Sequence, residues 1–267
     1  MLEGIAIGQY YPGNSYIHRL DPRIKIVCAL IYMVALFLVN NIIGYSLVFA
    51  AAAYVILLSG IPWKYILRSL RPVLVLVLIT VLLNMFLTPG SPVFSLGPVD
   101  ITREGISLGV FAAIRLLLLV VVASLLTLTT TPVNLTEGIE RLLSPGKPLG
   151  IPAHELAMMM TIALRFIPTL IEETDKIIKA QVSRGADFEG GNLIARAKNL
   201  VPLLVPLFVS SFRRADELAT AMEARCYRGG EGRTRLRELK LCDRDRTGIA
   251  ATGVFFAAIV ASRWWPI

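Results

Sequence analysis

The feature that most constrains this chain is a set of long, continuous apolar runs. The longest extends from Ile106 to Leu128 and holds a single charged residue, Arg115. About 20 apolar residues in helical form cross the hydrocarbon core of a bilayer. A backbone in lipid must satisfy its own polar groups, and these runs lack the alternation of barrel strands, so we expect transmembrane helices.

Five such runs are separated by polar segments or by segments rich in Gly and Pro. They cover residues 24–39, 42–60, 73–87, 106–128 and 249–265. The segments between them, including 61–72 and 88–105, are predicted to be loops. We therefore predict an all-α polytopic membrane protein with about five transmembrane helices. Its predicted organisation is an N-terminal bundle of four spans (1–129), a cytoplasmic region of long helices (130–248) and a last transmembrane helix (249–267).

Composition and charge support this class. Hydrophobic residues make up 55% and charged residues 17% of the chain, which fits neither a disordered chain nor an ordinary soluble domain. Of the 27 basic residues, 18 lie in segment 129–248, three each in 1–25 and 61–72, and one in 88–105. By the positive-inside rule the N-terminus and segment 130–248 are predicted to be cytoplasmic. The net charge of +8 is thus a topology signal and does not indicate a nucleic-acid partner.

The cytoplasmic segment is predicted to hold three helices. A short one runs from Pro132 to about Leu143, and two long ones run from Ala153 to about Arg184 and from about Asn192 to Tyr227. Each long helix has an apolar first half and a charged second half, and prolines lie in both apolar halves. These halves are too short for comfortable spans. We expect them to lie at the inner membrane surface or to pack against the bundle.

The two long helices end in a related pattern. Displacing one by 41 positions aligns Asp175 with Asp216, Ala180 with Ala221, Ser183 with Ala224, and Arg184 with Arg225. An arginine at a helix end offers a planar fork of donors to a carboxylate of a partner. The alternative is that each arginine only interacts favourably with its own helix dipole.

Catalytic and metal-binding motifs are not evident. The sequence has no phosphate-binding loop motif and no acidic residue in the apolar runs, its three cysteines are scattered, and His18 and His154 lie far apart. We expect no catalytic residue, no bound cofactor and no metal, with a structural role for His154. For Arg115 two roles stay open: a functional intramembrane charge, or a side chain that reaches toward the outer interface.

Four stretches resemble one known family. They are Ile17–Arg23, Ala163–Leu170, Ala180–Asp187 and Ala221–Gly229, with sequences IHRLDPR, ALRFIPTL, AQVSRGAD and AMEARCYRG. Together they resemble the energy-coupling factor (ECF) transporter transmembrane proteins, in the form shared by several substrate-binding subunits. The resemblance implies a prokaryotic plasma-membrane scaffold of an ABC-type importer. It would couple two cytoplasmic ATPases, which use ATP and magnesium, to a small membrane subunit that binds a vitamin or other micronutrient.

The resemblance also implies roles for particular residues. The ATPases would dock at the two helix ends, Ser183-Arg184-Gly185 and Ala224-Arg225-Cys226. Cys226 stands where the family pattern has glycine, and a left-handed backbone is strained for cysteine, so we expect that turn to have a different shape.

The substrate-binding subunit is expected on the apolar halves of the two helices, at Leu156, Met159, Ile162, Phe166, Leu203 and Leu207. The alternatives are a relative dedicated to cobalt or biotin, a conventional ABC permease with its own substrate path, an intramembrane enzyme, and a scaffold for another cytoplasmic complex.

Overall fold

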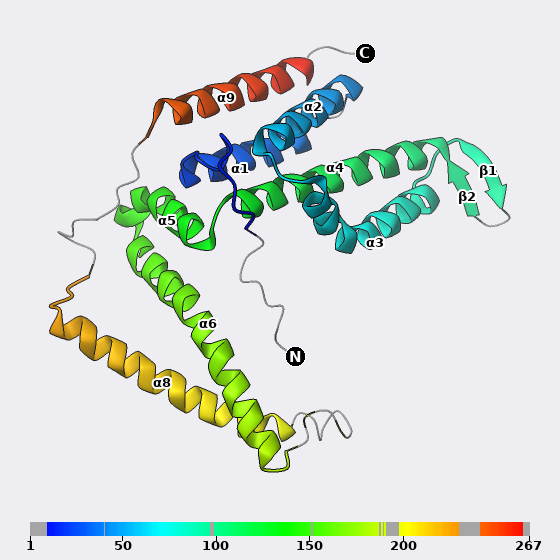
Figure 1. The fold of residues 1–267 in the computed structure, drawn as a ribbon. Coiled ribbons are helices and arrows are strands. Elements are labelled where there is room, and N and C mark those ends of the chain that lie inside the picture. Colours follow the sequence, from blue (N-terminus) through cyan, green and yellow to red (C-terminus); the bar gives the residue numbers. More distant parts are fainter. Residues whose placement is uncertain are drawn as a thin grey trace. The chain divides into compact units, whose positions relative to one another are not determined.

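The computed structural model describes residues 10–39, 41–96, 99–150, 152–186, 188, 190, 198–229 and 241–263. Its described part is helical apart from one short hairpin (Figure 1). The chain forms two compact units, each described here by itself. The unit within residues 8–138 and 238–267 we call the membrane bundle, and the unit within residues 139–237 we call the arm unit; the boundary falls inside helix α5.

The membrane bundle is built around α4. Its elements are α1 (Pro22–Leu38), α2 (Ile42–Ser59), α3 (Trp63–Leu87), β1 (Pro92–Leu96), β2 (Val99–Thr102), α4 (Arg103–Thr129), the start of α5 (Pro132–Leu143), and α9 (Asp243–Arg263). Helix α4 contacts α1, α2 and α3, and α9 packs along α1 and α2. Figure 1 shows α3 running beside α4, with the hairpin joining their ends.

Most of the predicted helices are confirmed, and two predicted loops are wrong. Segment 61–72 is not a loop, because α3 begins at Trp63 and continues through Pro72. A proline removes one backbone donor, which need not end a helix that is otherwise uninterrupted. Segment 88–105 contains the antiparallel strands β1 and β2 and the first turn of α4. Residues 264–267, with the predicted interfacial tryptophan pair, lie outside the described residues.

Two glycines on α4 set its close approach to α3. A Cβ at Gly105 would lie 2.6 Å from the carbonyl oxygen of Asn84, and one at Gly109 would lie 3.3 Å from that of Val81. Small residues four positions apart are a common device for packing helices inside membranes. The Gly-x-x-x-Gly spacing therefore explains why these two helices pack so tightly.

Two buried apolar clusters form the interior of the bundle. The larger centres on Leu36, Val48 and Ile259, which are almost fully buried, and the second includes Ile66 and Leu128. The Tyr32 hydroxyl lies in the first cluster and donates to the Val48 carbonyl at 3.0 Å. Residues from α1, α2, α4 and α9 meet in this first cluster, so the C-terminal helix belongs to the bundle.

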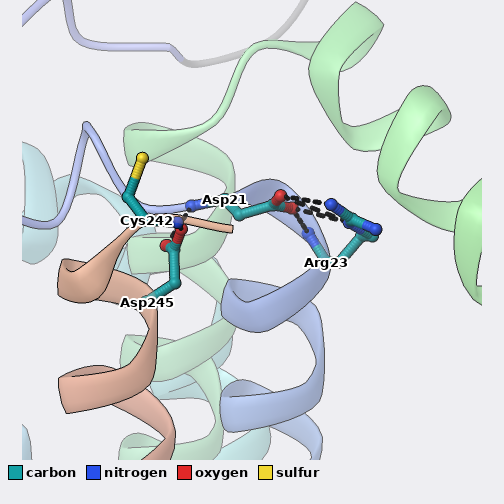
Figure 2. Close-up of polar contacts among 4 residues, drawn as sticks. All are labelled: Asp21, Arg23, Cys242 and Asp245. Carbon is teal, nitrogen blue, oxygen red and sulfur yellow. Dashed lines mark hydrogen bonds and ion pairs between the residues drawn. The ribbon is translucent and has the colours of Figure 1, made fainter. Parts of the chain in front are cut away.

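Buried carboxylates join the starts of α1 and α9 (Figure 2). The Asp245 side chain accepts hydrogen bonds from the backbone N–H of Asp21 at 2.9 Å and of Cys242 at 2.8 Å. Asp21 in turn accepts from the Arg23 backbone N–H at 2.9 Å and pairs with the Arg23 guanidinium. Each carboxylate thus satisfies a helix N-terminus, and Asp245 ties two segments that are far apart in sequence.

Four of the described helices are long and apolar enough to cross a membrane: α2, α3, α4 and α6 (Ala153–Ser183). Three of these cover predicted spans. Helix α1, at 17 residues, and α9, which starts with charged Asp243–Arg246, are helical but are not among the four. The apolar first half of α6 was predicted to lie at the inner membrane surface or to pack against the bundle, whereas the length and composition of the helix would let it span. Its charged second half, from Glu172, is the feature that distinguishes it from the other three.

The arm unit contains the rest of α5, a 3-10 helix (Ser144–Leu149), α6 and α8 (Val201–Ala224). The predicted short helix and first long helix are confirmed: α5 ends at Leu143, before Ser144-Pro145-Gly146 as predicted, and a 3-10 helix follows it. Helix α6 is continuous through Pro168. The second long helix is confirmed from Val201; residues 192–197 of the predicted segment lie outside the described residues.

Candidate functional site

Helices α6 and α8 form an antiparallel pair. Near the end of α6, the Gln181 side chain donates to the Pro202 carbonyl at 3.3 Å, close to the start of α8. Eight residues earlier on α6, Glu173 accepts from Ser210, and from Arg214 at 2.7 Å. Lower residue numbers on α6 are therefore paired with higher residue numbers on α8. The C-terminal ends of the two helices lie at opposite ends of the pair. Because α8 has 24 residues, these ends are about 36 Å apart along its axis.

The C-terminal turn of α6 has a well-defined hydrogen-bonding pattern. The N–H of Gly185 donates to the Val182 carbonyl at 2.9 Å, and the N–H of Ala186 donates to the Gln181 carbonyl at 3.0 Å. Gly185 has a left-handed backbone, with φ of 86°. This is the Schellman arrangement, in which a left-handed residue closes the helix and satisfies its last carbonyls. Arg184 is the last residue before that closure.

The C-terminal turn of α8 is built in the same way. The N–H of Cys226 donates to the Glu223 carbonyl at 2.8 Å, and the N–H of Tyr227 donates to the Met222 carbonyl at 3.0 Å. Cys226 has φ of 57° and is the one non-glycine with positive φ among the described residues. The expectation of a differently shaped turn is therefore wrong. The cysteine adopts the left-handed conformation in spite of its steric cost, of the order of 1–2 kcal/mol.

We call these two turns, residues 183–186 and 224–227, the arginine tips. Arg184 and Arg225 occupy the same position in them and both are exposed. Within the described part of the chain, neither guanidinium forms an ion pair or a side-chain hydrogen bond. Ser183 and Ala224 are exposed too, and the Ser183 hydroxyl donates to the Lys179 carbonyl at 3.0 Å. Each tip therefore presents an arginine fork with its donors available to another molecule.

The α8 tip has an additional anchor that sequence reasoning missed. Nε2 of His154, near the start of α6, lies 3.3 Å from the Tyr227 hydroxyl, and its Nδ1 lies 3.0 Å from a Glu140 carboxylate oxygen on α5. His154 thus has the structural role expected of it, with partners that its sequence position does not reveal. It connects the turn after α8 to two other helices of the arm unit.

The contact between Glu173 and Arg214 was also missed, although a signal for it exists. These two residues are 41 positions apart, which is the displacement that aligns the two tips. Residues at equivalent positions of the two helices therefore meet near the middle of the pair. Extending the comparison beyond the tips would have flagged this oppositely charged pair.

The residues predicted to contact the membrane partner differ in their exposure. Leu156 and Met159 on α6 are exposed, and Ile162 and Phe166 are half-buried. On α8, Leu207 is half-buried and Leu203 is only 9% exposed. The exposed apolar face of α8 is carried by other residues, Leu204, Val205, Phe208, Val209 and Phe212. An apolar partner would meet that face rather than Leu203.

Arg115, in the membrane bundle, contacts the C-terminal end of α1. Its guanidinium donates to the Tyr45 hydroxyl at 2.9 Å and to the Val39 carbonyl at 3.4 Å, and it lies 5.5 Å from the centre of the Phe37 ring. An arginine here satisfies a carbonyl at a helix C-terminus and interacts with an aromatic face. These contacts give Arg115 a structural role in joining α4 to α1 and α2.

No group of three or more His, Cys, Asp and Glu side chains that could hold a metal gathers among the described residues. The arrangement that could act on another molecule is therefore the pair of arginine tips, with the apolar faces between them.

Comparisons with known proteins identify the family. A family model described as CbiQ, cobalt transport protein, matches residues 13–236. A protein from Clostridium kluyveri is 57% identical over 268 residues, covering 99% of both chains. Relatives from Thermosediminibacter oceani (55% identical over 260 residues, 97% of this chain and 98% of the relative) and Bacillus subtilis (46% over 261 residues, 97% and 98%) match over nearly the same length.

All three relatives are named energy-coupling factor transporter transmembrane protein EcfT. Their similarity covers the bundle and both arginine tips. The chain therefore belongs to the CbiQ family, as a multi-pass membrane protein of the energy-coupling factor transporter transmembrane type.

Proposed function

We propose that this chain is the non-catalytic scaffold of an ATP-driven importer, which couples two cytoplasmic ABC-type ATPases to a small membrane subunit that binds a vitamin or other micronutrient. The observation that carries the proposal is the pair of arginine tips. They have the same backbone geometry, expose the same side chain and lie at opposite ends of one helix pair.

The separation of the tips favours two docking partners of the same kind. A single small site cannot reach two points about 36 Å apart along α8, whereas two related subunits can each receive one tip. The receiving surface is expected to be acidic, since an arginine fork pairs best with carboxylates. ATP and magnesium are used by those subunits, and this chain binds neither.

The proposed orientation places the arm unit in the cytoplasm. Of the 27 basic residues, 18 lie in segment 129–248, and Lys and Arg accumulate on the cytoplasmic side of membrane proteins. The N-terminus then lies on the same side. The ATPases are cytoplasmic in this arrangement, so the tips and their docking sites share one compartment.

The membrane subunit is proposed to rest on the apolar faces of α6 and α8. Leu156 and Met159 on α6 and the face from Leu204 to Phe212 on α8 are exposed and apolar. An exposed apolar surface of this kind is typical of an interaction site. Because the tips and this apolar surface lie on the same two helices, a movement of the ATPases would be transmitted along α6 and α8 to the membrane subunit.

The proposal is tested by reversing the charge at each tip in the complete complex. Arg184→Glu and Arg225→Glu are each expected to weaken ATPase retention about 30-fold or more, because breaking one partner of a buried charged pair costs about 2–5 kcal/mol. Lys176→Glu and Arg213→Glu are matched controls, since they make the same charge change on exposed parts of α6 and α8 that lie about two helical turns or more before the tips. The measurement is the amount of ATPase that co-purifies at a fixed salt concentration. Full retention by both tip variants would contradict the proposal.

A transporter dedicated to one substrate is the second candidate, because the matching family model is described as a cobalt transport protein. The same purification separates the two. Several different small membrane proteins recovered with the tagged chain indicate a shared scaffold, and a single one indicates a dedicated transporter.

A further inference from the structure

The membrane bundle contains a cavity that none of the roles above uses. Its volume is about 570 Å³, and it lies between α1, α2, α4, α9 and the segment before α1. Its walls are mainly apolar, with Ile24, Ala52 and Leu125 among them, and the stacked rings of Tyr32 and Phe255 line one end. Along α1 it extends from Ile24 to Tyr32, about 12 Å at the helical rise. That is close to the depth of one leaflet, half of a hydrocarbon core of about 30 Å.

The cavity opens sideways. On α2 it is bordered by Tyr54, Val55 and Leu58, which are 63%, 37% and 38% exposed. In a bilayer this side faces acyl chains. An empty apolar cavity forfeits dispersion contacts, and water inside it would lack polar partners. Hydrocarbon chains are therefore the favoured filling.

An extended acyl chain is thinner than a helix and fits a space of about 570 Å³.

The end of the cavity opposite the Tyr32–Phe255 stack is cationic. The Lys25 ammonium group lies there, 8% exposed, and donates to the carbonyls of His18 at 3.1 Å and Thr129 at 3.0 Å and to the Thr130 hydroxyl at 3.3 Å. All three partners are neutral. The Asp21 carboxylate, whose charge acts on Lys25, is itself paired with Arg23 at 2.8 Å.

Two exposed arginines adjoin this end. Arg19 directly precedes the lining residue Leu20 in sequence. The hydroxyl of the lining residue Tyr16 donates to the backbone carbonyl oxygen of Arg244 at 2.9 Å. Basic residues near the cytoplasmic surface attract anionic lipids. The positive-inside rule places this end of the bundle on the cytoplasmic side.

We propose that this cavity binds an anionic phospholipid of the cytoplasmic leaflet, with one acyl chain between the four helices and the phosphate beside Arg19 and Arg244. The lipid chain completes the packing of α1, α2, α4 and α9, and its headgroup balances the buried charge of Lys25. The site rests on the membrane location of the bundle and on its proposed orientation, and it does not depend on the roles proposed for the arginine tips.

The first test fills the cavity. A Cβ at Gly248 would meet only Leu20 at 3.6 Å and Ile24 at 3.9 Å, both lining residues, so Gly248→Leu places a side chain in the cavity without a backbone clash. Gly253→Leu is the matched control on the same helix, because a Cβ there meets nothing within 4 Å. The full-length chain is reconstituted in phosphatidylcholine vesicles that contain phosphatidylglycerol with a photoreactive acyl chain, and labelled peptides are identified by mass spectrometry.

We expect the wild type and Gly253→Leu to be labelled in the lining segments 24–32, 122–129 and 248–255, and labelling there to fall about tenfold or more in Gly248→Leu. Losing contact with two buried methylenes already corresponds to a change of that size. Circular dichroism and thermal unfolding confirm that both variants are folded. Equal labelling of Gly248→Leu and wild type, or no labelling of these segments in wild type, would overturn the site.

The second test addresses the headgroup. In wild type, the phosphatidylglycerol probe is expected to label the cavity about tenfold more strongly than the same probe on phosphatidylcholine, and the double variant Arg19→Gln/Arg244→Gln is expected to lose this preference. Arg68→Gln/Arg71→Gln, two exposed arginines of α3, is the control and keeps it. Equal labelling of wild type by both probes would refute an anionic ligand.

Discussion

The membrane bundle and the arm unit are held together in different ways. The bundle has two buried apolar clusters and buried polar groups, among them Lys25 and Asp245, whose hydrogen bonds link separate segments. In the arm unit, the described buried residues of α6 are Ala153 and Ala157, and that of α8 is Leu203. Among the described residues, side-chain hydrogen bonds join these two helices at two points, Gln181 with Pro202 and Glu173 with both Ser210 and Arg214. The bundle's conformation is thus specified by its own interior, whereas that of the arm pair depends on a few polar contacts and on whatever covers its apolar faces.

The largest effect is expected in the bundle, from Asp245→Ala. Removing the carboxylate takes the acceptor from the buried N–H of Asp21 and from the N–H of Cys242, an exposed residue. We expect a loss of about 2–3 kcal/mol in the free energy of unfolding, since an unsatisfied buried donor costs about 1–3 kcal/mol and an ordinary hydrogen bond contributes about 1 kcal/mol. Denaturation of the purified chain in detergent measures it. Asp243→Ala is the control, because its exposed pair with Arg246 should contribute almost nothing; equal effects of the two variants would remove the special role of Asp245.

A smaller effect is expected where α6 and α8 cross, from Glu173→Ala. The variant removes the acceptor of both Ser210 and Arg214, which are partly exposed, so the loss is expected near 1 kcal/mol. Amide hydrogen exchange in residues 203–214 should become about fivefold faster, with the bundle unchanged. Glu172→Ala, at the exposed neighbouring position, should leave exchange as in wild type. If Glu173→Ala has no effect on exchange, the polar crossing does not hold the arm pair.

The two arginine tips should respond in opposite directions to exchange of their left-handed residues. Cys226→Gly relieves a non-glycine residue at φ of 57° and is expected to stabilise the α8 tip by about 0.5–1 kcal/mol. Gly185→Ala places a Cβ at φ of 86° and is expected to destabilise the α6 tip by about 1 kcal/mol or more. Hydrogen exchange at residues 181–186 and 222–227 reads each tip separately. A stabilising Gly185→Ala would show that the two turns are not equivalent.

The smallest effect on stability is expected from a change of pH, through His18 in the segment before α1. His18 lies between the Ser15 hydroxyl, 2.7 Å from Nδ1, and the Tyr11 carbonyl, 3.0 Å from Nε2. Burial lowers the pKa of His18, and the charge of Lys25 lowers it further, against the raising effect of the Tyr11 hydrogen bond. The folded state favours the neutral ring, so this contribution to stability is present above the ordinary pKa near 6.5 and is lost as pH falls through the lower folded value. The thermal midpoint of wild type should approach that of His18→Gln between pH 7 and pH 5, and a constant difference would contradict this.

The sequence predicts helices well where a single physical signal dominates. Continuous apolar runs located α2, α4 and the body of α1, because lipid permits few other structures. Lys64, Arg68, Arg71 and Pro72 together resembled a loop, and the start of α3 was misplaced. The close packing of α3 and α4 has its own signal in the sequence, the four-residue spacing of Gly105 and Gly109.

The candidate site was predictable in position but not in geometry. The displacement of 41 residues predicts the positions of both arginines from the sequence. It could not show that α6 and α8 are antiparallel, because that depends on contacts such as Gln181 with Pro202. The shape of the turn at Cys226 was mispredicted because residue preference outweighed the hydrogen bonds that close the helix.

The contact between Glu173 and Arg214 carries a consequence for stoichiometry. Equivalent positions of two antiparallel helices meet near their crossing, which is the signature of an approximate two-fold axis within one chain. Ile171 and Phe212, close to that axis, each precede their arginine by 13 residues, so the lever arms are about equal, near 20 Å. Under the proposed function, one copy of this chain would therefore match the symmetry of a pair of ATPases and place one tip on each, a 1:2 stoichiometry.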